Sequence, residues 1–142
     1  LLKDVYHTTS TKEYLNSLVK EIISLFPLGL SLKVGKQISD FQLDPKILIP
    51  LGIIINELFT NIMKYAFTGR DSGMIEVALT GDRENIELII KDNGIGLPEG
   101  FELEKQNGFG LMLIKMFTEQ FTGSFLMENH IGTKSVVNLR IG

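Results

Sequence analysis

The sequence lacks cysteine altogether, and this absence excludes a disulfide framework and metal sites built from thiolates. It is compatible with a reducing compartment. An excess of basic residues is also missing, because the formal net charge is -3 at pH 7. No basic field therefore attracts nucleic acid, and a polyanionic ligand has to be held by local groups.

Long hydrophobic runs are scarce as well. The longest, Ile47 to Ile55, contains Pro50 and Gly52 and falls short of the roughly 20 apolar residues that a membrane span requires. We therefore expect no membrane contact by this segment. A Met start and a basic stretch before an apolar one are absent too, so we interpret the sequence as a piece of a longer protein. We expect this piece to be cytoplasmic.

The remaining composition is that of an ordinary globular domain, with 44% hydrophobic and 22% charged residues among 142. A chain of this length forms one domain that buries roughly 70% of its unfolded surface. Residues 1–9 show no clear period, and we assign them to a linker from a preceding element. Residues 10–142 are assigned to the domain.

The stretch Asn56 to Phe67, NELFTNIMKYAF, organises the rest of the chain. On a helix, Glu57, Asn61 and Lys64 lie at i, i+4 and i+7, so a carboxylate, an amide and an ammonium share one narrow face. From the spacing alone, an ordinary solvated helix face is an alternative. The opposite arc is apolar and suits packing against a sheet: Leu51, Ile55, Leu58, Phe59, Ile62 and Ala66.

Capping residues and periodicity predict the elements before and around this stretch. Ser10 and Glu13 form a capping box for the first helix. The central helix begins at Asp44-Pro45, and Pro50 predicts a kink or a restart because it removes one helical hydrogen bond. The other predictions are a helix over 11–26, a strand over 28–34 and at most a short strand over 41–43.

The second half of the sequence predicts two hairpins with one helix between them. A regular βαβ alternation and the third-glycine spacing are missing, which disfavours a dinucleotide fold. We predict an α+β two-layer sandwich with a mixed, mostly antiparallel sheet and helices on one face. The elements are strands over 75–80 and 86–90, a loop over 92–98, a helix from Gly108 to Gly123 with Leu113, Met116, Phe117 and Phe121 on its apolar side, and strands over 124–128 and 133–141.

Two polar residues share the parity of apolar strand residues. Asp92 has the parity of Leu88 and Ile90, so its carboxylate is expected to face the layer that they bury, at a cost in free energy unless donors meet it. Thr133 has the parity of Val137 and is expected to face the same layer. A turn-forming Asp before Asn-Gly and an ordinary strand Thr are the alternatives.

Two glycine pairs and the polar helix face suggest a phosphate-bearing ligand. Gly94 and Gly96 allow close backbone approaches, while Gly108 and Gly110 lie at a helix start, where unpaired N–H groups suit phosphate. Taken singly, a tight turn and a flexible helix entry explain the pairs equally well. Asn61 offers a neutral oxygen that suits Mg²⁺ beside phosphates. A GxxxxGK[ST] motif is absent, which excludes a P-loop.

In combination, these residues resemble the N, G1, G2 and G3 boxes of the GHKL ATPase superfamily in order and approximate spacing. From Tyr6 to Ile141 the sequence resembles the catalytic ATP-binding domain of a sensor histidine kinase. The residues of its motifs are most similar to those of the subfamily with a His-Arg-x-x-Asn-Asn type phosphoacceptor box. The boxes read Asn56-Glu57-x-x-x-Asn61-x-x-Lys64, Asp92-x-Gly94-x-Gly96, Gly108-x-Gly110-Leu111 and Gly132-Thr133.

The resemblance implies Mg-ATP as the ligand and assigns a role to each residue. Asp92 would accept the adenine amino group with Thr133 beside it, and Asn61 would ligate Mg²⁺. Glu57 would occupy the acid/base position, and Lys64 would join Glu57 and Asn61 as a catalytic residue. A short lid over 98–107 would bring Lys105 to the terminal phosphate. The other implied ATP-binding residues are Lys64, Tyr65, Gly94, Gly96, Gly108, Gly110 and Leu111.

The resemblance also implies a protein histidine kinase of a two-component system. The γ-phosphoryl would pass to a histidine on a separate dimerisation domain, expected before Leu1, with a response regulator receiver domain as a further partner. The sequence itself carries no phosphoacceptor box: His7 is interpreted as a linker histidine, His130 as a turn residue, and Phe109 replaces a commoner smaller or aliphatic residue. A serine kinase acting on an anti-sigma antagonist and a non-catalytic nucleotide-sensing domain are alternatives.

Overall fold

The structure is a computed structural model that describes residues 9–26 and 29–142. Most of the expected linker, residues 1–8 with His7, lies outside the described residues, as do residues 27–28. Thr9 and Ser10 form strand β1 (Thr9–Ser10), which pairs in antiparallel fashion with β3 (Gln42–Leu43). The folded part of the chain therefore includes Thr9.

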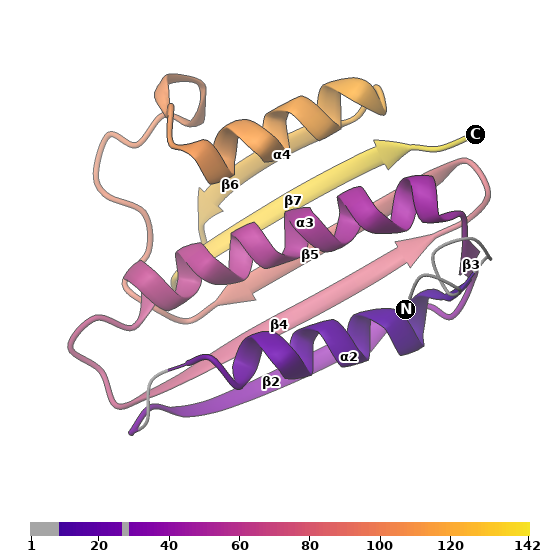
Figure 1. Ribbon diagram of the computed structural model, residues 1–142. Coiled ribbons are helices and arrows are strands. Elements are labelled where there is room, and N and C mark those ends of the chain that lie inside the picture. The colour runs from indigo at the N-terminus through magenta and orange to yellow at the C-terminus, as the bar shows by residue number, and fades with distance from the viewer. Residues whose placement is uncertain (1–8, 27–28) are drawn as a thin grey trace.

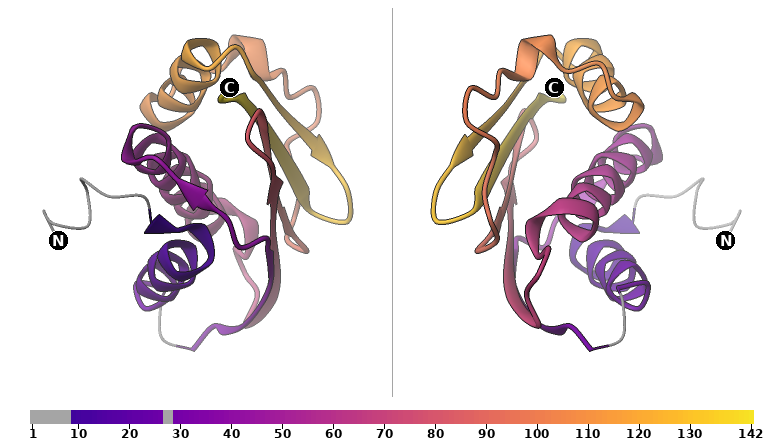
Figure 2. Two further views of the ribbon diagram at one scale, coloured as in Figure 1. Left: turned by 90° about the vertical axis from the view of Figure 1, so that its right-hand side faces the viewer. Right: turned by 90° about the vertical axis from the view of Figure 1, so that its left-hand side faces the viewer.

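A five-stranded sheet forms one layer, and three helices cover one of its faces (Figures 1 and 2). The strand order is β2-β4-β5-β7-β6; β2 and β4 are parallel, and the other pairs are antiparallel. This confirms the predicted α+β two-layer sandwich. The elements are β2 (Ser31–Ile38), β4 (Ser72–Gly81), β5 (Asn85–Asp92), β6 (Ser124–Asn129), β7 (Thr133–Arg140), α2 (Thr11–Ile23), α3 (Pro45–Asn61) and α4 (Phe109–Gln120).

The core lies between the sheet and α3. Alternate residues of β5 turn into this layer, and Ile86, Leu88 and Ile90 are each 1% exposed. They meet the apolar arc of α3, where Leu51, Ile55, Leu58 and Phe59 are buried, as the periodicity predicted. Because both patterns point into one layer, the polar face of α3 remains at the rim.

Pro50 neither ends nor restarts α3, so the predicted restart was wrong. The helix is continuous from Pro45 to Asn61 with Pro50 inside it. A proline in a helix interior costs about 3 kcal/mol because one hydrogen bond is lost. Pro50 itself is buried beside Leu51 and Ile54, and we attribute the continuity to this packing, which outweighs the lost bond.

The helical stretch Pro45–Ala66 is long and apolar enough to cross a membrane by length and composition, which the short apolar runs of the sequence did not indicate. Half of its most apolar window is buried inside the domain. Its hydrophobicity is therefore accounted for by the core that it forms with the sheet.

Other element boundaries differ from the predictions by a few residues. The first helix ends at Ile23, because the N–H groups of Leu25 and Phe26 bond three residues back in a tighter turn. The next strand was predicted over 28–34, but β2 runs from Ser31 to Ile38, the length over which it pairs with β4. On α4, Met116 is 50% exposed, whereas Ile114 is buried. Met116 was therefore wrongly grouped with Leu113, Phe117 and Phe121, because it lies on an exposed side of the helix.

Candidate functional site

A cavity of about 720 Å³ lies where the helix layer meets the ends of β5 and β7. Its walls come from α3, from the π-helix η1 (Ile62–Ala66), from the loop between β5 and α4, and from the start of α4. It brings together most of the site residues predicted from the sequence, namely Glu57, Asn61, Lys64, Tyr65, Asp92, Gly96, Gly108, Gly110, Leu111 and Thr133. Gly94 and Lys105 do not line it.

Asp92 ends β5 and is only 6% exposed, as its parity predicted. Its Oδ1 accepts hydrogen bonds from the backbone N–H of Gly94 (2.8 Å) and of Thr133 (3.3 Å). Within residues 9–26 and 29–142, Oδ2 has no hydrogen-bond partner, and no fully buried side-chain nitrogen or oxygen lacks one. Oδ2 is therefore accessible from the cavity. The bond to Gly94 is the turn-forming interaction, so Asp92 both forms a turn and presents a free acceptor.

The electrostatics of Asp92 combine opposing effects. Burial raises the pKa of its carboxyl above the ordinary value, whereas the N–H groups of Gly94 and Thr133 and the charge of Arg70 lower the pKa in part. Keeping an ionised carboxylate here consequently costs stability.

Glu57, Asn61 and Lys64 line the same wall of the cavity, as the helical spacing predicted. The regular α-helix ends at Asn61, however, and η1 begins at Ile62. Such π-turns are uncommon and often occur at functional sites. The polar face predicted for a regular helix is therefore split, with Asn61 at the junction and Lys64 in the wider turn.

Gly110 places the first turn of α4 beside the carboxylate of Glu57 on α3. A Cβ at Gly110 would collide with Oε2 of Glu57, whereas a Cβ at Gly108 would meet nothing within 4 Å. Gly108 caps α4 without a side-chain hydrogen bond. Unpaired N–H groups at a helix start favour a negatively charged group, and Glu57 already supplies one carboxylate beside them.

The first glycine pair has a structural role in the loop after β5. A Cβ at Gly94 would collide with the carbonyl oxygen of Ala66, and the N–H of Ile95 donates to that same oxygen at 2.9 Å. Gly96 lines the cavity and has a φ of 81°, which favours glycine. The close backbone approach predicted at Gly94 is thus an approach to the backbone of Ala66.

Lys105 lies on the surface of the lid. Its Nζ forms an ion pair with Glu102 at 2.7 Å, and its side chain is 77% exposed. The lid includes a short 3₁₀-helix, η2 (Leu103–Lys105).

Two side chains that were not predicted fix this lid. Lys115 of α4 donates from Nζ to the carbonyl oxygens of Leu103 (2.7 Å) and Gln106 (2.8 Å). At the other end, Oδ1 of Asn129 accepts from the N–H of Leu97 at 2.7 Å. Each contact joins positions that are distant in the chain, so the sequence does not predict it. The sequence shows only that Lys115 and Asn129 are polar residues on partly apolar elements.

A family model supplies the decisive comparison. Residues 32–133 match the model described as the histidine kinase-like ATPase domain, a range that includes the polar face of α3, Asp92, the glycine pairs and Thr133. The chain belongs to this family. As an ATP-binding kinase domain it is expected to bind ATP.

Two curated proteins similar to this ATPase domain are histidine kinases. It is 27% identical over 94 residues to blue-light-activated histidine kinase 2 of Erythrobacter litoralis, covering 64% of this chain and 26% of that protein. It is 30% identical over 94 residues to sensor histidine kinase PdtaS of Mycolicibacterium smegmatis, covering 63% of this chain and 19% of that protein. The chain thus spans about a quarter or less of these relatives.

Solved structures share the fold of this ATPase domain. The histidine kinase domain of a blue-light activated kinase from Erythrobacter litoralis has a TM-score of 0.83 and 19% identity, covering 93% of this chain and 61% of that one. Mycobacterial sensor histidine kinase MprB has a TM-score of 0.69 and 18% identity, covering 95% of this chain and 97% of that one.

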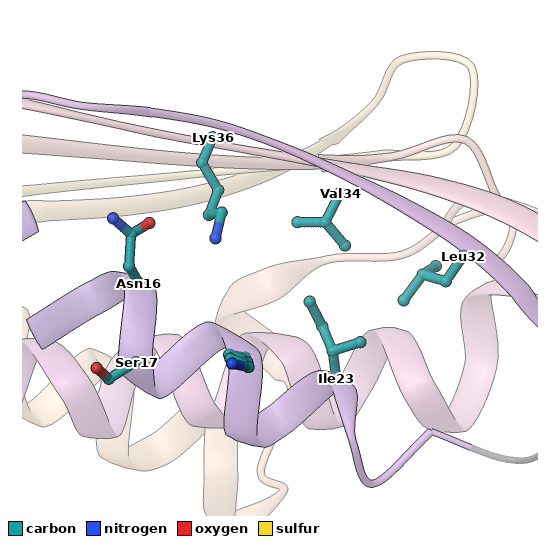
Figure 3. A pocket seen from close by; sticks show the side chains of 7 residues that line it. Asn16, Ser17, Ile23, Leu32, Val34 and Lys36 are labelled. Atoms are coloured by element: carbon teal, nitrogen blue, oxygen red, sulfur yellow. The ribbon is translucent and has the colours of Figure 1, made fainter. Parts of the chain in front are cut away.

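A second hollow in the ATPase domain, of about 460 Å³, lies between α2 and the edge strand β2 (Figure 3). Asn16 and Lys36 face one another across one end, and Ile23 faces Val34 and Leu32 toward the other. No carboxylate is among its lining residues, and none of the predicted site residues lies there. The cavity that contains Asp92 is therefore the candidate site.

Proposed function

We propose that this domain binds Mg-ATP and delivers its γ-phosphoryl group to a histidine on a separate dimerisation domain, as part of a two-component sensor histidine kinase. The observation that carries the proposal is the cavity that joins Asp92, with its free Oδ2, to the polar face of α3 and the start of α4. One end recognises a base and the other receives phosphates. Catalysis by such a domain rests on positioning and charge neutralisation.

Adenine is assigned to the strand end. Oδ2 of Asp92 would accept a hydrogen bond from the adenine amino group, and Thr133 would support the base from β7. The fixed Oδ1, held by two backbone N–H groups, supports this role because it orients the whole carboxylate. Gly96 and Leu111 would contact the nucleotide from the loop and from α4.

The phosphates are assigned to the helix side of the cavity. The N–H groups at Gly108 and Gly110 would receive them, with Lys64 as a point charge and Tyr65 near the ribose or a phosphate. Lys105 would reach the terminal phosphate only after leaving its exposed pair with Glu102, a change that costs little because surface ion pairs are weak. Gly94 would act indirectly, by packing the loop on η1.

Mg²⁺ is assigned to Asn61. Among the described residues, no group of three or more His, Cys, Asp or Glu side chains could hold a metal ion. This suits Mg²⁺, which takes few protein ligands when phosphates and waters complete its shell. Bound there, the ion would neutralise phosphate charge, while Glu57, one turn earlier, would orient a water or act as a base.

The histidine that accepts the phosphoryl group is assigned to a partner domain. The proposal includes four further expectations. The protein would belong to the subfamily with a His-Arg-x-x-Asn-Asn type box and would form homodimers through its histidine-bearing domain. It would act on a response regulator receiver domain and would be cytoplasmic. An exposed apolar stripe on α4, with Phe109 77%, Met112 53% and Met116 50% exposed beside the cavity, supports docking of a helical partner.

Calorimetric titration with ATP, with and without Mg²⁺, tests the proposal. Asp92→Asn should weaken ATP binding by roughly 100-fold or more, because an ionised acceptor is replaced. Asn61→Ala should abolish the effect of Mg²⁺ while leaving Mg-free binding nearly intact. Asp71→Asn and Asn16→Ala, which change residues outside the cavity, are the matched controls. Unchanged affinity in Asp92→Asn would refute the adenine assignment.

A further inference from the structure

Arg70 connects the turn after η1 to the strand end that carries Asp92. Its N–H donates to the carbonyl of Phe67 at 3.0 Å, and Gly69 has a φ of 75°, so the turn is compact. From this turn, Nη1 of Arg70 donates to the carbonyl oxygen of Asn93 at 2.6 Å. Arg70 therefore touches the residue next to Asp92 without lining the cavity.

Asn93 is itself firmly held. Its N–H donates to the carbonyl of Met74 at 3.2 Å, and its Oδ1 accepts from the N–H of Met74 at 2.8 Å. These bonds extend the β4–β5 pairing beyond the Ile75–Asp92 pair. The guanidinium thus binds the backbone of a residue that is paired with β4 and adjoins Asp92.

The charges around Asp92 come from two elements. On the helix side, Glu57 and Lys64 line the same cavity, and neither forms an ion pair with Asp92 in the described parts of the chain. From the turn, Arg70 is the cation whose charge favours the ionised form of Asp92. An ionised carboxylate can only accept hydrogen bonds, whereas a protonated one can also donate.

We propose that Arg70 is a positioning residue for purine selection, which holds the Asp92 turn and keeps Asp92 an obligate acceptor. An obligate acceptor matches a purine with an amino group at position 6 and rejects one with a carbonyl there. The inference rests on the proposed function, because it assumes that Asp92 meets the base. Loss of Arg70 would weaken the binding of adenine nucleotides and would reduce the domain's preference for adenine over guanine nucleotides.

The first test is a pH titration of Asp92 itself, monitored by carboxyl ¹³C NMR in the free protein. The pKa of Asp92 should be higher in Arg70→Gln than in wild type, and Arg70→Lys, which keeps the charge, should restore it. Arg83→Gln, in the hairpin at the opposite end of β4, is the control and should leave the titration unchanged. An unchanged pKa in Arg70→Gln would overturn the inference.

The second test compares ADP and GDP affinity by calorimetry between pH 5.5 and 8. Arg70→Gln should weaken ADP binding by roughly five- to tenfold at pH 7, about what one ordinary hydrogen bond contributes. The loss should grow as pH falls, and GDP should be affected less. An equal loss of affinity for both nucleotides at every pH would indicate that Arg70 has a merely structural role and would overturn the inference. If wild type binds neither nucleotide, the proposed function itself is wrong.

Discussion

At the scale of single residues, Asp92 shows how a functional group is placed by a local rule. Strand alternation turns its side chain into the layer that buries Leu88 and Ile90, whatever the consequence for a carboxylate. Two backbone N–H groups and Arg70 offset this burial only in part, so the pKa of Asp92 stays raised. The residue proposed to select the base is thus also one that lowers stability.

Asp92→Asn should therefore stabilise the free domain at neutral pH. The folded protein binds the Asp92 proton more tightly than the unfolded chain, whose carboxyl has the ordinary pKa of 3.8. Stability consequently falls as pH rises from there through the raised pKa, and the cost persists above it. We expect a Tm higher by roughly 1–4 °C at pH 7, with the difference vanishing below pH 3.8. A lower Tm for the variant at pH 7 by calorimetry would contradict this.

At the scale of elements, the central helix α3 is the one whose observed course differs most from the prediction made from its own residues. Pro50 predicted a kink or a restart, and the restart is wrong because α3 continues through Pro50; the helix changes to a π-turn only after Asn61. Propensity is a weak preference that burial of a whole helix face outweighs. The change at Asn61 has no comparable sequence signal, because the same residues also suit a regular helix.

The lid is an element that Lys115, one of its two side-chain anchors, is expected to order. Lys115→Met removes both hydrogen bonds from α4 to the carbonyls of Leu103 and Gln106. Amide hydrogen exchange over residues 98–107 should become roughly 30-fold faster, since two bonds of about 1 kcal/mol each are lost. Exchange in β5 should not change.

Lys105→Met is the matched control for the lid. It changes a lysine of the same segment but removes only an exposed pair with Glu102, which contributes little to stability. Exchange in this variant should equal that of wild type. Equal exchange rates in both variants would show that Lys115 does not order the lid.

At the scale of the whole molecule, the helix layer leaves an apolar surface of α4 uncovered. The stripe on α4 formed by Phe109, Met112 and Met116 is exposed next to the cavity, while the rest of the helix packs on the sheet through Ile114. Large exposed apolar side chains in one stripe mark interaction surfaces. The ATP-binding and docking functions are thus proposed for adjacent surfaces of one short helix.

The double variant Met112→Gln/Met116→Gln should separate these functions. Neither residue lines the cavity, so ATP affinity measured by calorimetry should match wild type. Phosphoryl transfer to the histidine-bearing domain, measured in the full-length protein, should fall by roughly tenfold or more if the stripe docks that domain. Met74→Gln, an exposed methionine on β4, should have no effect. Undiminished transfer in the double variant would place the docking surface elsewhere.

The sequence by itself determined what repeats locally. Strand parity predicted that Asp92 and Thr133 face one layer, and helical spacing predicted that Glu57, Asn61 and Lys64 share a wall; all five line one cavity. These patterns need only the geometry of one element, with a period of about 2 or 3.6 residues. The order of the motifs was sufficient to predict the family to which the chain belongs.

Only the tertiary structure decided how the elements meet. The parallel pairing of β2 with β4, the contacts of Lys115 and Asn129 with the lid, and the bond from Arg70 to Asn93 each join positions distant in sequence. Lys105, expected at the phosphate, lies in a surface pair for the same reason. Such contacts depend on which segments the folded chain brings together, and no periodic pattern in one segment records its distant neighbour.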